Sequence, residues 1–173
     1  MPEKDKLNFF ARIFRSNEKQ TSVESKVTTS VNESDFATVG KTIPQTIISY
    51  TSDQDQVLTQ QQKQDLERLL ATYPPLTMGE INFIPFEAGT LYGGYYVRLF
   101  IRNGKDLLEE FSMDDITVGL VDASSDLVAK GRFRPTEFGS LMFGETRIWT
   151  FAWRPAEVLK PNADLSVFTV TLG

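Results

Sequence analysis

The residues best suited to acid–base chemistry in this chain are two pairs of adjacent carboxylates, Glu109-Glu110 and Asp114-Asp115. General acid–base catalysis needs two carboxyl groups whose pKa values are held apart by burial or by neighbouring charges. Both pairs precede a predicted strand in a polar segment, so we interpret them as a solvated loop. A carboxylate-dependent enzyme stays an alternative hypothesis, with these candidate acids: Glu80, Glu87, Glu109, Glu110, Asp114 and Asp115.

The chain has 173 residues and contains neither histidine nor cysteine. Without an imidazole there is no Ser-His-Asp triad and no histidine metal ligand. Without a thiol there is no cysteine nucleophile, disulfide or zinc-thiolate site. The formal net charge of −5 disfavours general nucleic-acid binding, whose affinity comes mainly from neutralising phosphates. We therefore expect a non-enzymatic protein with no cofactor, no metal and no nucleic-acid partner.

Three short motifs resemble ligand sites but lack the context that such sites need. Asp122 and Asp126 have the spacing of part of a calcium loop without its remaining ligands, so they predict a hairpin turn. Gly93-Gly94 and Asn103-Gly104 lack the strand, glycine-rich loop and helix of a phosphate-binding loop. They predict a bulge and a turn with positive φ.

Cationic side chains recur on one face of each of two predicted strands, around residues 95–102 and 127–133. Alternate residues of a strand share a face, so adjacent strands would give one sheet face a basic stripe. Such a stripe suits an acidic partner or single-stranded nucleic acid, whereas the alternative is a solvated face whose arginines pair with local acids. The candidate partner-binding residues are Tyr96, Arg98, Arg102, Lys130, Arg132 and Arg134, with Phe100 beside them.

From Met78 onward, apolar and polar residues alternate with the period of a strand. Short strands separated by turns, with no helical stretch among them, predict an antiparallel β-sandwich of immunoglobulin-like size. The fold class is therefore mainly β, with one amphipathic helix and a flexible N-terminal extension before the sandwich. We expect the following residues to be buried between the two sheets: Val97, Leu99, Trp149, Phe151 and Phe168.

The segment before the sandwich divides into a helix and an extension. Leucines near helical spacing predict a single amphipathic helix of about five turns that starts near Ser52 and ends before Pro74-Pro75. Residues 16–46 are rich in Ser and Thr and poor in aromatic residues, so they predict a flexible linker. The predicted division is residues 1–46 as N-terminal segment and linker, and residues 47–173 as helix plus sandwich.

The first residues have a pattern of their own. An apolar group shares one side of a short predicted helix, opposite arginines, and can pack on its own domain or dock on a membrane or a partner. Its members are Leu7, Phe9, Phe10, Ile13 and Phe14. Neither a signal peptide nor a run of roughly 20 apolar residues for a membrane span is present. The sequence thus predicts a cytoplasmic protein that can lie peripherally at the inner face of the membrane.

Several blocks of the predicted strands, in order, resemble the bacterial SLAP domain, which is named for S-layer assembly. They are Asn82–Gly89, Val97–Gly104, Leu120–Ala123, Ala129–Phe133, Trp149–Phe151 and Asp164–Ser166, preceded by Tyr73–Leu76. These blocks cover roughly the last hundred residues. The resemblance implies a helper, not an enzyme, that works with an accessory SecA-type motor to export S-layer proteins in Gram-positive spore formers.

The partner that this resemblance implies is a protein, either an S-layer precursor or the accessory Sec motor. A related module with a different client is an alternative. A structural module of the cell envelope is another, because sandwich domains occur there too. A fold alone does not choose among these functions.

Overall fold

The computed structural model describes residues 24–25, 28–31, 41–43, 46–105 and 110–173. Two compact units make up the chain. One consists of Met1–Ser22 with Tyr50–Pro74, and the other of Val23–Ser49 with Pro75–Gly173. The division of the chain between residues 46 and 47 stays a prediction.

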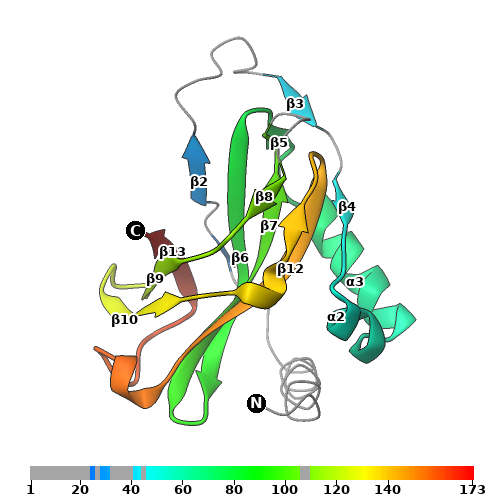
Figure 1. Ribbon diagram of the computed structural model, residues 1–173. Coiled ribbons are helices and arrows are strands. Elements are labelled where there is room, and N and C mark those ends of the chain that lie inside the picture. Colours follow the sequence, from blue (N-terminus) through cyan, green and yellow to red (C-terminus); the bar gives the residue numbers. More distant parts are fainter. Residues whose placement is uncertain (1–23, 26–27, 32–40, 44–45, 106–109) are drawn as a thin grey trace. The chain divides into compact units, whose positions relative to one another are not determined.

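The described part of the first unit contains two helices where the sequence predicts one (Figure 1). They are α2 (Ser52–Val57) and α3 (Gln60–Ala71). Each helix begins at a threonine, Thr51 or Thr59, whose hydroxyl accepts a backbone hydrogen bond while a glutamine three residues on closes a capping box. Leu58 between the helices is extended, at φ −78° and ψ 129°. The prediction missed this break because the leucine spacing continues across it.

The second unit is mainly β, as the sequence predicts, with the strands in two larger sheets and two strand pairs (Figure 1). The five-stranded sheet has the order β2-β6-β7-β12-β4 and the four-stranded sheet the order β1-β13-β9-β10. Neighbouring strands are antiparallel except for β1 beside β13 and β4 beside β12. The two pairs are β8 with β11 and β3 with β5.

The strand bounds show that β6 and β7 are the longest of the described strands. The strands are β1 (Glu24–Ser25), β2 (Thr28–Val31), β3 (Thr42–Ile43), β4 (Ile47–Ile48), β5 (Leu76–Thr77), β6 (Glu80–Leu91), β7 (Gly94–Asn103), β8 (Phe111–Ser112), β9 (Ile116–Val121), β10 (Leu127–Phe133), β11 (Ser140–Leu141), β12 (Glu145–Trp153) and β13 (Val167–Leu172). Two 3-10 turns, η2 (Thr136–Phe138) and η3 (Pro155–Glu157), flank β12. Strands β1, β2 and β3 fall within the segment that the sequence predicts to be a linker.

The core lies between the two larger sheets, because both contribute side chains to one buried cluster. Four predicted core residues are almost completely buried, namely Val97, Leu99, Phe151 and Phe168. Trp149 differs from the prediction, since it is only partly buried against this cluster. Trp153, on the same face of β12, is 2% exposed and is therefore the core tryptophan of this strand.

Two glycine-containing segments differ from the predicted bulge at Gly93-Gly94 and the predicted positive-φ turn at Asn103-Gly104. The β6–β7 hairpin turns through Tyr92 and Gly93, both at positive φ, and Gly94 already belongs to β7. A Cβ on Gly94 would lie 1.8 Å from the carbonyl oxygen of Trp153, so close packing requires this glycine. Gly104 has no positive φ, but a Cβ there would lie 2.7 Å from the Thr77 carbonyl oxygen. Asp122–Asp126 does form the predicted turn between β9 and β10.

Candidate functional site

The predicted basic stripe does not form, because its two strands belong to different sheets. Strand β7 is in the five-stranded sheet and β10 is in the four-stranded sheet. Arg98 and Arg102 are 2% and 5% exposed, and Tyr96 beside them is also buried. The prediction was wrong for these three residues, since β7 is a central strand that is buried on both faces.

A buried ion pair explains why Arg98 is tolerated inside the molecule. Arg98 pairs with Glu87 on β6, and the Tyr96 hydroxyl donates a hydrogen bond of 2.7 Å to the same carboxylate. The register between β6 and β7 shifts between Pro85 and Glu87, and Phe86 at the shift has its ring 5.4 Å from the Arg98 guanidinium. Burial lowers the pKa of Arg98 to about 9, which still leaves it charged at neutral pH.

Arg102 is held by a neutral partner. Its Nε and Nη2 donate to Asn82 Oδ1 over 3.0 and 2.7 Å. Burial lowers the pKa of Arg102 to about 10, against the opposing effect of the Glu80 charge. The pKa of Glu80 is raised by burial. These contacts give Arg102 a structural role on β7.

The structure distributes the candidate acids of the enzyme hypothesis over separate places. Glu80 and Glu87 are on β6, whereas Asp114 and Asp115 directly precede β9 in the other sheet. Glu110 and Asp114 are exposed, and Glu109 lies outside the described residues. Among the described residues, no group of three or more acids could hold a metal ion.

The remaining cations of the predicted stripe do come together, two on β10 and Arg134 directly after it. We call Lys130, Arg132 and Arg134 the β10 basic surface. Arg132 binds the Asp115 carboxylate through one edge of its guanidinium, with Nε 2.7 Å from Oδ1 and Nη2 2.5 Å from Oδ2. Arg134 Nε is 3.7 Å from the same Oδ2. The hydrogen bond from Arg132 holds the pKa of Asp115 below its usual range.

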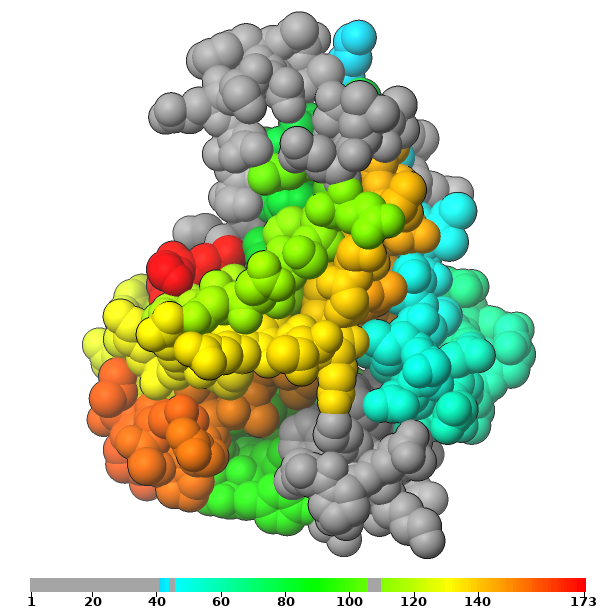
Figure 2. All heavy atoms as spheres, viewed as in Figure 1, coloured from blue at the N-terminus to red at the C-terminus, as the bar shows by residue number. Residues whose placement is uncertain are grey.

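This basic surface is open to solvent. The side chains of Arg132 and Arg134 are 68% and 74% exposed, and Lys130 is exposed too. In Figure 2 the yellow band, which is β10 with the residues after it, lies at the front surface beside the yellow-green segment that leads into β9. Of the residues that the sequence selects as partner-binding, these three are therefore the ones a partner can reach.

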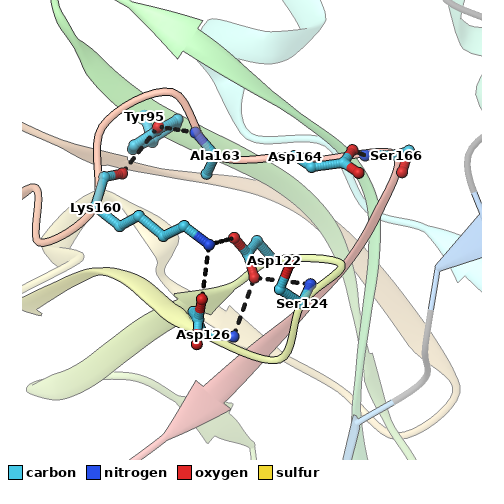
Figure 3. A network of polar contacts seen from close by, with 8 residues as sticks. All are labelled: Tyr95, Asp122, Ser124, Asp126, Lys160, Ala163, Asp164 and Ser166. Atoms are coloured by element: carbon cyan, nitrogen blue, oxygen red, sulfur yellow. Dashed lines mark hydrogen bonds and ion pairs between the residues drawn. The ribbon is translucent and has the colours of Figure 1, made fainter.

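A second polar cluster, which the sequence did not select, links the β9–β10 turn to the segment after η3 (Figure 3). Lys160 Nζ lies 2.6 Å from Asp122 Oδ2 and 2.7 Å from Asp126 Oδ2. The Lys160 carbonyl accepts a bond of 3.1 Å from the Tyr95 hydroxyl, which in turn accepts a bond of 3.0 Å from the Ala163 backbone. The sequence gives no signal for Lys160, because it is 38 residues from Asp122.

The bonds around Asp122 fix the β9–β10 turn to the segment after η3, and we call Asp122 with its partners Ser124, Asp126 and Lys160 the Asp122 clasp. Its Oδ1 accepts from the backbone N–H groups of Ser124 and Asp126, each at 3.0 Å, while Oδ2 binds Lys160. Lys160 first, and then the two backbone N–H groups, lower the pKa of Asp122, whereas the carboxylates of Asp122 and Asp126 raise the pKa of Lys160. Both groups are charged near neutral pH, which suits a fixed ion pair.

Arg147 on β12 is another residue that sequence analysis missed. Its guanidinium donates to the Ser49 carbonyl over 3.1 Å, to the Ser140 carbonyl over 3.2 Å and to the Phe138 carbonyl. These charge-assisted hydrogen bonds connect Arg147 on β12 to the residue after β4, to η2 and to β11. Only its position in an alternating strand is visible in the sequence.

The apolar group Leu7, Phe9, Phe10, Ile13 and Phe14 lies outside the described residues. Its docking to lipid, to a partner or to its own domain therefore stays a prediction. Neither α2 nor α3, nor any other described helix, is long and apolar enough to cross a bilayer.

Comparison with known proteins gives one match. A family model described as the SLAP domain matches residues 48–173 of the chain. The matched range runs from within β4 to the end of the chain and includes α2, α3 and the strands from β5 to β13. No curated protein matches, and no solved structure does. The resemblance in the sequence blocks is thus confirmed.

Proposed function

The chain belongs to the SLAP domain family, and from that membership we propose a non-enzymatic binding module that serves protein secretion. The family match over residues 48–173 is the observation that carries this proposal. The module assists the export or assembly of S-layer proteins, and its partner is an S-layer precursor or an accessory SecA-type motor.

The arrangement of charges supports binding over catalysis. Glu87, Asp115 and Asp122 each neutralise an arginine or lysine at short range. A carboxylate fixed in this way stabilises the fold, whereas an acid–base pair needs two carboxyl groups facing one substrate with separated pKa values. The β10 basic surface, by contrast, presents charged donors to solvent, where a partner can meet them.

We place the module in the cytoplasm, at the inner face of the membrane, because there a helper meets a client before the motor moves it. The apolar group of the first residues, with nearby arginines, is a suitable peripheral tether. Flotation with anionic vesicles, using the full chain and a chain that lacks residues 1–16, tests the lipid version. If both stay in the soluble fraction, the lipid tether is wrong.

The experiment for the function is affinity capture of the tagged full chain from its native host under gentle crosslinking, followed by mass spectrometry. We expect a motor of the accessory Sec system or a surface-layer precursor in the eluate. The matched control is a Phe151→Ala chain, in which the loss of a core ring disrupts the module but keeps the tag. An eluate without secretion components, or one that the control reproduces, would contradict the proposal.

A further inference from the structure

We propose that the β10 basic surface and the threonine- and valine-rich sheet face beside it bind an extended acidic segment of a protein partner. This inference rests on the proposed binding function and specifies the chemistry of what is bound. It places the contact on the outer face of the four-stranded sheet, away from the core cluster.

The first argument is an excess of positive charge at this place. Arg132 and Arg134 share the single carboxylate of Asp115, and among the described residues Lys130 has no ion-pair partner. The chain as a whole has a net charge of −5, so three exposed cations at alternate positions on β10 and just after it form a local field of opposite sign. Such a patch attracts an acidic partner and disfavours a basic one.

The second argument is the geometry of Arg132. The Nε and Nη2 edge of its guanidinium already binds a carboxylate, that of Asp115, in the bidentate arrangement that suits Arg–carboxylate recognition. Asp115 therefore shows what kind of group this surface binds. Arg134 at 3.7 Å is beyond hydrogen-bond distance from Asp115 and keeps its donors for a second carboxylate.

The third argument is the shape and polarity of the sheet beside these cations. Across the strands, Lys130 lies opposite Gly119, which lies opposite Thr171. One row further, Leu127, Val121 and Thr169 face one another in the same way. Gly119 has no side chain, and this lets the side chains of Leu127 and Thr171 pack over it. Their nearest atoms would lie 2.7 and 2.5 Å from a Cβ at this position.

These features favour an extended peptide over a nucleic acid. Leu127 and Val167 on this face are 38% and 46% exposed, which gives apolar contact next to the cations. Proteins that bind single strands present aromatic rings on which bases stack. The aromatic residue of β10, Phe133, instead packs against Phe151 and Trp153 in the core, with ring centroids 4.9 and 5.8 Å away.

The test measures binding of a short labelled peptide in which Glu and Val alternate, by fluorescence anisotropy with the full chain. The double variant Arg132→Glu, Arg134→Glu should bind about tenfold more weakly or worse, because two attractions become repulsions. Asp115→Asn should bind the peptide several-fold more tightly, because it removes the competing carboxylate. The matched control is Arg68→Glu on α3, which is 71% exposed beside Asp65 and should leave affinity unchanged. Melting temperatures verify that each variant is folded.

The inference is wrong if the double variant binds the peptide as well as the wild type, or if Asp115→Asn weakens binding. It is also wrong if a labelled oligothymidine binds the wild type more tightly than the peptide, since the surface would then select phosphates. Affinity capture with the double variant separates this inference from the proposed function. If the double variant still captures a secretion partner, the proposed binding surface is wrong but the proposed function stands. If the wild type captures no secretion partner, the proposed function is wrong.

Discussion

At the scale of single residues, charged side chains hold this protein together from inside. The pair Glu87–Arg98 is buried on both sides, with side chains 6% and 2% exposed. Taking two such charges out of water costs several kcal/mol, which their mutual attraction and the bond from Tyr96 offset. The pair thus stabilises the fold only while both members are present.

We expect Glu87→Ala to lower the free energy of unfolding by about 3–5 kcal/mol, because the buried Arg98 charge loses its carboxylate partner. Urea denaturation measures this loss. The control is Asp65→Ala, which removes the exposed partner of Arg68 and should cost less than about 1 kcal/mol. A double variant Glu87→Leu, Arg98→Met should recover most of the stability. A loss for Glu87→Ala as small as for Asp65→Ala would show that the buried pair is not coupled in this way.

The Asp122 clasp predicts a dependence of stability on pH. Lys160 first, and then two backbone N–H groups, lower the folded-state pKa of Asp122 below its unfolded value. The ionised form is therefore favoured in the folded state, and its contribution is present above the unfolded pKa of about 3.9. That contribution is lost as the pH falls through the lower, folded-state pKa.

Asp122→Asn should accordingly melt at a lower temperature than the wild type at neutral pH, with a difference that shrinks on acidification to about pH 2. Differential scanning calorimetry over this range measures the difference. Asp114→Asn, which changes an exposed acid just before β9, is the matched control and should melt like the wild type at neutral pH. A difference that persists undiminished in acid would show that ionisation of Asp122 does not stabilise the fold.

At the scale of elements, the β6–β7 hairpin sets the frame of the five-stranded sheet. Its tip is tight, since Tyr92 and Gly93 take φ values of 51° and 77° and Gly94 packs directly on the backbone of Trp153. Backbone atoms cannot rotate away as a flexible side chain can. The contact between Gly94 and β12 is therefore a rigid constraint on the hairpin.

We expect Gly94→Ala to destabilise the protein by more than Gly93→Ala. At Gly93 the cost is about 1–2 kcal/mol for a left-handed conformation, with the nearest atom, a Pro155 side-chain carbon, at 3.4 Å. At Gly94 a methyl group would lie 1.8 Å from a backbone oxygen, so the strands must separate. Urea denaturation of both variants gives the order. Equal losses would mean that the hairpin shifts freely relative to β12.

From the sequence it is easier to predict which segments form strands, and which side chains they bury, than which strands lie next to one another in the sheets. Alternation identifies the faces of β7 and β12, since Val97, Leu99 and Phe151 are buried as expected. Alternation does not say which strands pair, so it predicts one stripe for Arg98 and Arg132 although they belong to different sheets. Pairing depends on contacts between distant residues, and the same holds for Lys160, whose partner Asp122 is 38 residues away.

The division of the helical segment shows a second limit. Apolar spacing alone predicts one helix through Leu58, Leu66 and Leu70, and these three leucines are in fact buried. The break between α2 and α3 comes instead from local polar bonds, as Thr59 and Gln62 cap each other at 3.1 and 2.8 Å. A period in the sequence therefore indicates which side chains are buried, whereas capping residues decide where each helix begins.

At the scale of the whole molecule, the sandwich depends on contacts that cross between its sheets. Trp153 makes one of them, because its indole Nε1 donates a bond of 3.2 Å from β12 to the Val118 carbonyl on β9. Its ring also lies against Phe133 of β10, 5.8 Å between centroids. Trp149 instead contacts Phe138 on the chain between β10 and β11, 5.4 Å between centroids, and is only partly buried.

Trp153→Ala should therefore lower the free energy of unfolding by about 3–5 kcal/mol, and Trp149→Ala by clearly less. A third variant, Trp153→Phe, keeps most of the ring but leaves the Val118 carbonyl without its donor, and should cost about 1–3 kcal/mol. Urea denaturation followed by circular dichroism measures all three without relying on tryptophan fluorescence. Since small domains are stable by only about 5–15 kcal/mol, the alanine change at Trp153 also threatens partner binding through loss of folded protein. If Trp149→Ala were the more damaging change, the half-buried tryptophan and not Trp153 would hold the sheets together.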